Sequence, residues 1–118
     1  MKKIGFIGAY DKTDLIIYIA KILTTLKKKV LVIDATTKQK ARYVVPVINP
    51  TKMYVTEYEE IDIAVGFPNI EDIKRYLGYS EEQDLDYDIV LIDTDSIEGF
   101  SIFKLEESFK NYFVTSFD

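Results

Sequence analysis

Two short apolar runs that each end in an aspartate constrain the fold of this chain more than any other feature. They are residues 29–34 (KVLVID) and residues 87–93 (YDIVLID). Near-continuous apolar runs of this length are typical of strands buried on both faces, as in a parallel sheet. Segments with helical spacing lie between and beside them. This alternation predicts an α/β fold, a three-layer sandwich with a mostly parallel sheet.

Two segments carry clear helix signals. The first starts near Thr13, which can act as N-cap, with Asp14 close to the positive end of the helix dipole. Its apolar stripe, predicted to face the sheet, comprises Leu15, Ile19, Ile22 and Leu26, widened by Ile16, Ala20 and Leu23. The second is expected to begin after Asn69 and to end at Gly78. A weaker helix is predicted over residues 102–109.

Further strands are predicted from short apolar segments at residues 4–8, 53–56 and 111–116. The alternation of Ile61, Ile63 and Val65 with polar residues predicts a half-exposed strand near a sheet edge. Two prolines within residues 43–50 disfavour a central strand there. The length of 118 residues predicts a single domain over residues 1–118, or the N-terminal part of one.

The expected topology brings polar residues together at one edge of the sheet. Gly8, Asp34 and Asp93 each end a predicted strand, and right-handed crossovers place the carboxyl ends of parallel strands at the same edge. Ligands of such folds bind outside that edge. The loop after the first strand also contains Lys12 and Thr13 and leads into a helix, which is the order of elements in a P-loop.

Composition excludes several classes of function. The chain has no cysteine and no histidine, which rules out disulfides, thiolate chemistry and Ser-His or Cys-His nucleophile pairs, and disfavours a zinc site. The net charge of −5 argues against a general nucleic-acid binder, because phosphate contacts need clustered cations. No apolar run approaches the length of a membrane span, and a cytoplasmic location is the default expectation.

The pattern resembles the ParA/MinD-type ATPases, P-loop proteins with a deviant Walker A loop. The resemblance rests on residues 30–36 (VLVIDAT), residues 87–95 (YDIVLIDTD) and the last strand containing residues 113–116 (FVTS). It implies ATP and Mg²⁺ as cofactors. Lys12 would hold the β- and γ-phosphates, and Gly8 would begin the phosphate loop. Thr13 and Asp93 would bind Mg²⁺, and Asp34 would orient the attacking water.

Aligned on Lys12, the loop departs from the family pattern at Ile7, Ala9, Asp11 and Asp14. Asp11 stands immediately before Lys12, where the family has a glycine, so a carboxylate would face the phosphates. At ~4 Å and an effective dielectric constant of about 20, each unit-charge repulsion is about 4 kcal/mol. That corresponds to roughly three decades of affinity. The expected function is therefore a degenerate ParA/MinD-like domain, a protein-interaction, assembly or regulatory module with weak or no ATP binding.

Two alternatives stay open at this point. One is an active Mg-ATP-dependent ATPase switch, in which Mg²⁺ offsets the extra acid. The other is a receiver-like signalling domain, suggested by Asp93, Asp95, Gly99-Phe100 and the strand that follows, although no acidic pair ends the first strand. Detection of a phosphorylated Asp93 after acetyl phosphate treatment would favour the receiver.

Partners are expected to be proteins, including further copies of this chain. The sequence stops directly after a predicted strand, whereas ParA/MinD relatives continue, so the sheet is expected to be incomplete at its C-terminal side. Uncovered edges and apolar faces favour self-association. No direct contact with nucleic acid is expected, and membrane association would come only through partners or a missing C-terminal region.

Overall fold

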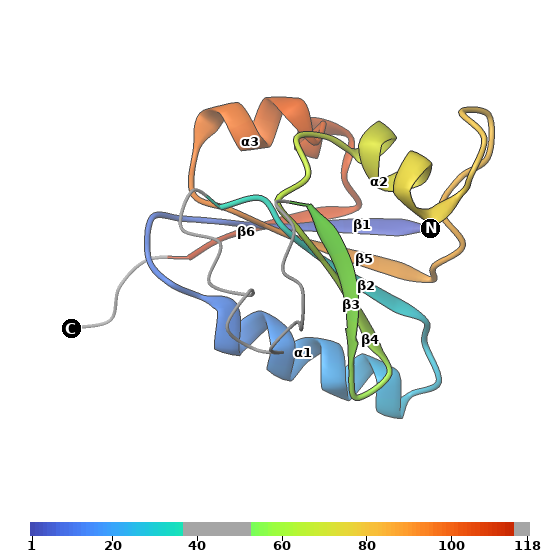
Figure 1. The fold of residues 1–118 in the computed structure, drawn as a ribbon. Coiled ribbons are helices and arrows are strands. Elements are labelled where there is room, and N and C mark those ends of the chain that lie inside the picture. The colour runs from blue at the N-terminus through green and yellow to red at the C-terminus, as the bar shows by residue number, and fades with distance from the viewer. Residues whose placement is uncertain (37–52, 115–118) are drawn as a thin grey trace.

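The computed structural model describes residues 1–36 and 53–114. It contains a six-stranded sheet with the strand order β3-β4-β2-β5-β1-β6 (Figure 1). The strands are β1 (Lys2–Ile7), β2 (Val30–Asp34), β3 (Tyr54–Tyr58), β4 (Ile61–Val65), β5 (Ile89–Thr94) and β6 (Lys110–Phe113); the helices are α1 (Thr13–Thr25), α2 (Ile70–Leu77) and α3 (Ile97–Ile102), with a 3₁₀ turn at Leu105–Glu107. All neighbouring strands are parallel except β3, which is antiparallel to β4. The predicted α/β fold with a mostly parallel sheet is confirmed.

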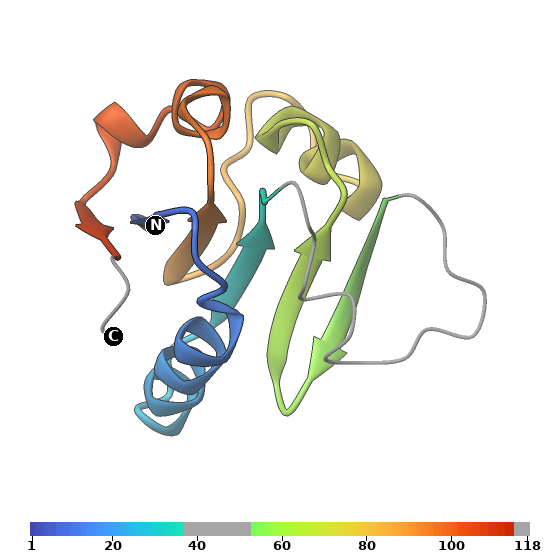
Figure 2. The ribbon, with the colours of Figure 1, turned by 90° about the vertical axis from the view of Figure 1, so that its left-hand side faces the viewer.

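Helices cover both faces of the sheet and create two apolar cores. On one face α1 packs on the sheet through Ile16, Ile17 and Ala20. On the other face lie α2, α3 and the 3₁₀ turn, where Ile73 and Leu105 pack against the sheet (Figures 1 and 2). Because β2 lies between these layers, all five of its residues are buried, as its apolar sequence predicts.

The register places the carboxyl ends of the central strands side by side. Asp34 at the end of β2 lies opposite Asp93 of β5, and Ile7 at the end of β1 lies opposite Thr94 of β5. Gly8 follows directly after β1. The predicted meeting of Gly8, Asp34 and Asp93 at one sheet edge is therefore confirmed.

Helix α2 has the predicted ends. The Asn69 side chain accepts a hydrogen bond from the backbone N–H of Asp72 at 2.8 Å and so caps the first turn. Gly78 closes the helix with φ 83°, a left-handed conformation that glycine adopts without steric cost. Local hydrogen bonding thus fixes both ends of this helix.

Several predicted boundaries are wrong. The first strand starts at Lys2, and Gly8 lies outside it. The strand at Ile61–Val65 is almost fully buried because it lies second from the edge, with β3 paired outside it. The weak helix predicted over residues 102–109 is replaced by α3, which ends at Ile102, and by the 3₁₀ turn, separated where Lys104 has φ 54°. Lys12 rather than Thr13 is the N-cap residue of α1.

The buried face of α1 also differs from the prediction. The residues that face the sheet are Thr13, Ile16, Ile17 and Ala20. Of the predicted inward stripe, Ile16 and Ala20 are buried and Ile19 and Leu23 pack against the core, whereas Leu15, Ile22 and Leu26 are exposed. The helix is apolar on both sides, so the periodicity marked a second face that points away from the sheet.

Two predictions fall on residues that the structure does not describe. The irregular segment with two prolines, residues 43–50, lies outside the described residues, and so do Thr115 and Ser116 of the predicted last strand.

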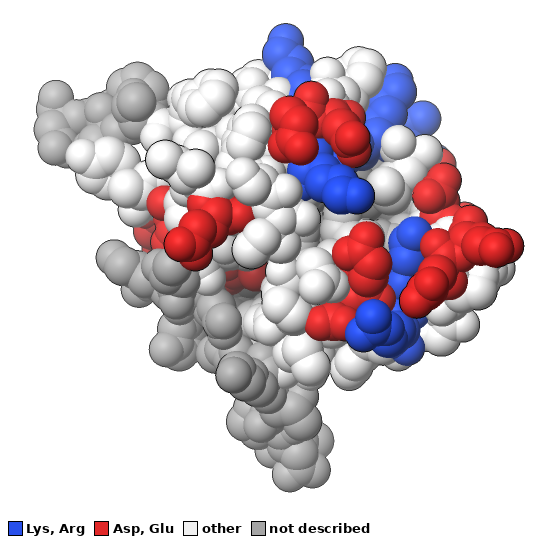
Figure 3. Space-filling view, turned by 90° about the horizontal axis from the view of Figure 1, so that it is seen from above, with Lys and Arg blue, Asp and Glu red and all other residues white. Residues whose placement is uncertain are grey.

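Over the face that carries α2 and α3, the described lysine and arginine side chains are interspersed with aspartate and glutamate (Figure 3). This mixed surface differs from the clustered cations of nucleic-acid-binding domains.

Candidate functional site

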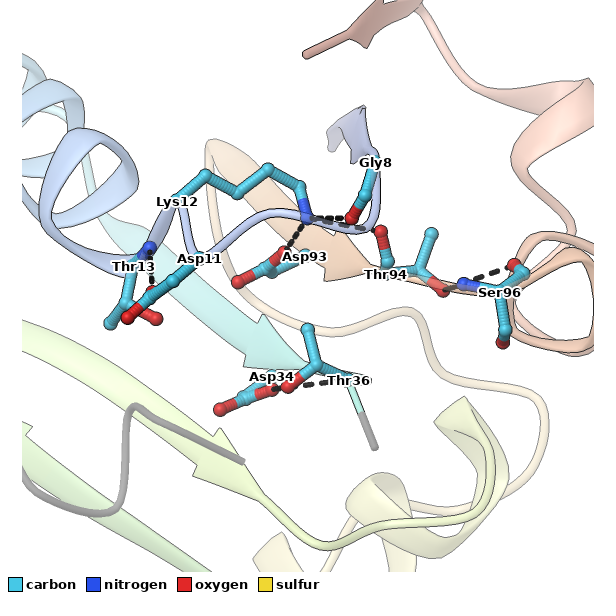
Figure 4. Close-up of polar contacts among 9 residues, drawn as sticks. All are labelled: Gly8, Asp11, Lys12, Thr13, Asp34, Thr36, Asp93, Thr94 and Ser96. Carbon is cyan, nitrogen blue, oxygen red and sulfur yellow. Dashed lines mark hydrogen bonds and ion pairs between the residues drawn. The ribbon is translucent and has the colours of Figure 1, made fainter. Parts of the chain in front are cut away.

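The candidate site lies where the loop after β1 meets the end of β5 (Figure 4). These two strands are adjacent and parallel. From β1 the chain crosses through α1 toward β2, and from β5 it crosses through α3 toward β6, in opposite directions along the sheet. Ligands of open α/β sheets bind outside the carboxyl ends of the strands at such a switch point.

Lys12 connects three elements at this edge. Its side chain is only 1% exposed, and its Nζ atom lies 2.6 Å from Asp93 Oδ1. The same ammonium group donates hydrogen bonds to the Gly8 carbonyl at 2.8 Å and to the Thr94 carbonyl at 3.1 Å. An ammonium group has three hydrogens. Two of them are donated to these carbonyls, and the charge is paired with Asp93, so Lys12 joins the start of α1 to the ends of β1 and β5.

Asp93 is buried at the end of β5, and its environment opposes ionisation. The contact with Lys12 is an ion pair without hydrogen-bond geometry, so Oδ1 has no hydrogen-bond partner. Burial raises the pKa of Asp93 to about 6, with smaller contributions from Asp34 and Asp95, and Lys12 only partly offsets this. Burial therefore outweighs the ion pair. Near pH 6 about half of the Asp93 carboxyl groups carry a proton.

Asp34 is buried beside Asp93 but makes different contacts. Its Oδ1 atom accepts a hydrogen bond from the Thr36 backbone N–H at 3.0 Å and another from the Thr36 hydroxyl at 2.5 Å. Figure 4 shows this pair below the contacts of Lys12. The structure thus brings the two predicted acids together across the β2–β5 pair and orients Asp34 toward the turn that follows β2.

The Asp11 side chain occupies the place at the start of α1 where a helix N-terminus can bind an anion. Its Oδ1 atom accepts a hydrogen bond from the backbone N–H of Thr13, the first residue of α1, at 3.0 Å. Backbone N–H groups at this end of a helix are the usual donors to phosphate. A carboxylate of the chain therefore takes one donor that the resemblance assigns to a nucleotide.

The loop backbone also lacks the conformation of a phosphate cradle. Within residues 8–12, all of which the structure describes, no residue has a positive φ. Backbone anion nests alternate right-handed and left-handed residues. Asp11, which stands where the family has a glycine, therefore does not adopt a left-handed conformation.

The cavity beside Thr13 and Asp93 is small, whereas a neighbouring cavity of about 340 Å³ is lined by Ile7, Gly8, Asp95, Ser96, Ile97, Phe100 and Phe113. The small cavity has a volume of about 20 Å³ and is lined by Ala9, Tyr10, Asp11, Thr13, Thr36, Asp93 and Asp95. A cavity of roughly this size holds about one water molecule, whereas ligand pockets measure roughly 300–1,000 Å³. Thr13 and Asp93, the predicted Mg²⁺ ligands, do line one cavity. A triphosphate does not fit into it in this arrangement.

Two backbone positions at the site have roles that side-chain patterns did not reveal. The Thr94 carbonyl accepts hydrogen bonds from both Lys12 Nζ and the Gly8 N–H. Gly8 passes so close to Val114, the residue after β6, that a Cβ atom on Gly8 would overlap the Val114 carbonyl oxygen. Its glycine is needed for this close approach. Carbonyl acceptors have no signature in the sequence, and only the position of Thr94 after Asp93 could have suggested it.

Comparisons with protein-family models, with curated proteins and with solved structures found no match to this chain. Among residues 1–36 and 53–114, no three or more His, Cys, Asp or Glu side chains are grouped so that they could hold a metal ion. No helix in that part of the chain is long and apolar enough to cross a membrane.

Proposed function

We propose that this chain is a degenerate ParA/MinD-like, P-loop NTPase-like domain that acts as a protein-interaction or regulatory module with weak or no ATP binding. One observation carries the proposal. The Lys12 ammonium, which would hold the phosphates, is buried and fully engaged by Asp93, Gly8 and Thr94. These contacts give the residue a structural role without a nucleotide.

The surroundings of Lys12 support the same function. A phosphate at the start of α1 would have to displace the Asp11 carboxylate from the Thr13 N–H. It would also have to open a cavity with room for about one water. Both changes cost free energy that a nucleotide would have to supply, and the negative charge of Asp11 adds repulsion.

The active Mg-ATP-dependent switch is a second candidate because Lys12, Thr13 and Asp93 meet at the sheet edge. Thr13 and Asp93 line one cavity, as a shared Mg²⁺ site would require. In this alternative the Lys12 ammonium would leave its ion pair with Asp93 and bind phosphate instead. The strand order gives no support to the receiver alternative, because receivers have the order 2-1-3-4-5, whereas β1 here lies between β5 and β6.

Thermal unfolding with and without Mg-ATP tests the proposal. A ligand at 100 times its Kd adds about 2.7 kcal/mol to the free energy of unfolding. We expect no shift in wild-type midpoint at millimolar Mg-ATP. Asp11→Gly removes the carboxylate and admits a left-handed residue, so it should gain a measurable shift. Asp14→Gly makes the same change in the first turn of α1 and serves as the matched control.

A clear Mg-ATP shift in the wild-type protein, confirmed by calorimetric titration, would overturn the proposal and favour the active switch. A shift that appears only in Asp11→Gly would support it, since the loop would then be intact apart from that residue. Equal Mg-ATP shifts of the unfolding midpoint in Asp11→Gly and Asp14→Gly would show that Asp11 does not control nucleotide access.

A further inference from the structure

Helix α1 is apolar on the side that faces away from the sheet. Its exposed apolar residues are Leu15, Tyr18, Ile22 and Leu26, which we call the outer stripe. Leu15 and Ile22 are seven residues apart, and so are Ile19 and Leu26, which is the spacing of a helix–helix seam. A helix that is apolar all round is normally buried on all sides. The outer stripe therefore indicates a further contact surface.

The outer stripe continues into an apolar groove beside the helix. This α1/β6 groove has a volume of about 520 Å³ and is lined by Ile4, Phe6, Leu15, Ile19, Leu23, Leu91, Tyr112, Phe113 and Val114. It lies on the α1 face of the sheet, over the β1 and β6 side. Among the described helices, only α1 lies on this face (Figures 1 and 2). A large continuous apolar surface of this kind marks a site of protein association.

We propose that the outer stripe and the α1/β6 groove bind α1 of a second copy of this chain, with the two helices antiparallel. Charge complementarity selects this occupant. Exposed Asp14 lies at the start of α1, and exposed Lys27 and Lys28 follow its end. In an antiparallel pair, the acid of each copy faces the lysines of the other, and the two-fold axis repeats this contact. A parallel pair would place like charges together.

This inference rests on the interaction role proposed above and names a partner for it. The surface is separate from the loop that contains Lys12, so the two can fail independently. Nucleotide binding would contradict the proposed function and leave the dimer intact. A monomeric protein would overturn the dimer and leave the absence of nucleotide binding unaffected.

Sedimentation velocity over a concentration series tests the dimer. Ile22 is 46% exposed and belongs to neither core cluster, so Ile22→Lys should leave the fold intact, as circular dichroism can verify. We expect the dimer Kd to rise about 100-fold, because each dimer loses two buried isoleucines. The matched control is Ile102→Lys, since Ile102 is 50% exposed on the opposite face. A wild-type monomer at high micromolar concentration would overturn the proposal, and so would a dimer unaffected by Ile22→Lys.

Cysteine cross-linking tests the orientation, because the native chain has no cysteine. When the acidic start of α1 in one copy faces the basic end of α1 in the other, Leu15 of one copy lies near Leu26 of the other. A mixture of Leu15→Cys and Leu26→Cys proteins should therefore form a disulfide-linked dimer faster than either variant alone. Faster linkage of Leu15→Cys with itself would indicate parallel helices and overturn the antiparallel arrangement. Equal rates in all three samples would overturn the α1 interface.

Discussion

Replacing Asp93 with asparagine removes a buried carboxylate whose ionisation the fold opposes. The pKa of Asp93 rises from 3.8 to about 6, mainly because burial strips the carboxylate of water. The Lys12 ammonium, 2.6 Å away, acts in the opposite direction but is the weaker influence. Asparagine keeps nearly the same size, so the substitution tests the charge rather than the packing.

The direction of the pH effect follows from this shift. Between about pH 4 and 6, folded protein retains a proton on Asp93 that the unfolded chain has released. The stabilisation from this proton is complete below the unfolded pKa and is lost as the pH rises through the folded pKa. One pKa unit corresponds to about 1.36 kcal/mol, so the shift amounts to roughly 3 kcal/mol.

Urea unfolding of the wild type and Asp93→Asn from about pH 4 to pH 7 measures this effect. The free energy of unfolding of the wild type, relative to the variant, should fall by on the order of 3 kcal/mol over this range. Carboxyl carbon NMR should place the Asp93 midpoint near pH 6. In Lys12→Met the midpoint should move higher, because the ammonium that favours the carboxylate is gone.

A relative stability that stays constant or rises with pH would refute this reasoning. It would show that the Lys12 contact outweighs burial and holds the Asp93 carboxylate ionised. An unchanged NMR midpoint in Lys12→Met would separately show that the ion pair does not influence Asp93.

The remaining predictions concern backbone geometry. Gly8→Ala should lower the free energy of unfolding by about 1–3 kcal/mol, because its Cβ would overlap the Val114 carbonyl oxygen. Unchanged stability in urea would show that Val114 does not approach the loop this closely. Asn69→Ala should lower the free energy of unfolding by about 1 kcal/mol through loss of the α2 cap, whereas Asn69→Asp should retain most of it. Equal losses in both Asn69 variants, measured by urea unfolding, would contradict the capping role.

Features controlled by local sequence were predicted well. Asn69 and Gly78 fix both ends of α2 through contacts within a few residues, so the sequence contains the whole signal. The meeting of Asp34 and Asp93 was also predictable. Apolar runs identified the buried strands, and crossover handedness placed their ends at one edge.

Features that depend on distant contacts were missed. The periodicity of α1 could not tell which apolar side faces the sheet, because both sides are apolar. The engagement of Lys12 by the Thr94 carbonyl joins residues far apart in the chain, and a backbone acceptor carries no residue signature. The start of α3 did have a local signal, since the Ser96 hydroxyl accepts a hydrogen bond from the Gly99 N–H at 3.0 Å. The glycine in that short helix obscured it.

The position of β1 inside the sheet has a consequence for folding. Lys2 pairs with Ile89, and Ile4 pairs with Lys110, so β1 cannot complete its pairing until β5 and β6, which follow it in the chain, have been synthesised. The β3–β4 hairpin and its pairing with β2 need no later residues and can form earlier. Non-local pairing of parallel strands slows folding, because the chain loses loop entropy before the contacts form. During synthesis, the apolar β1 and α1 are therefore exposed until β5 emerges, which makes this stage the one most open to aggregation.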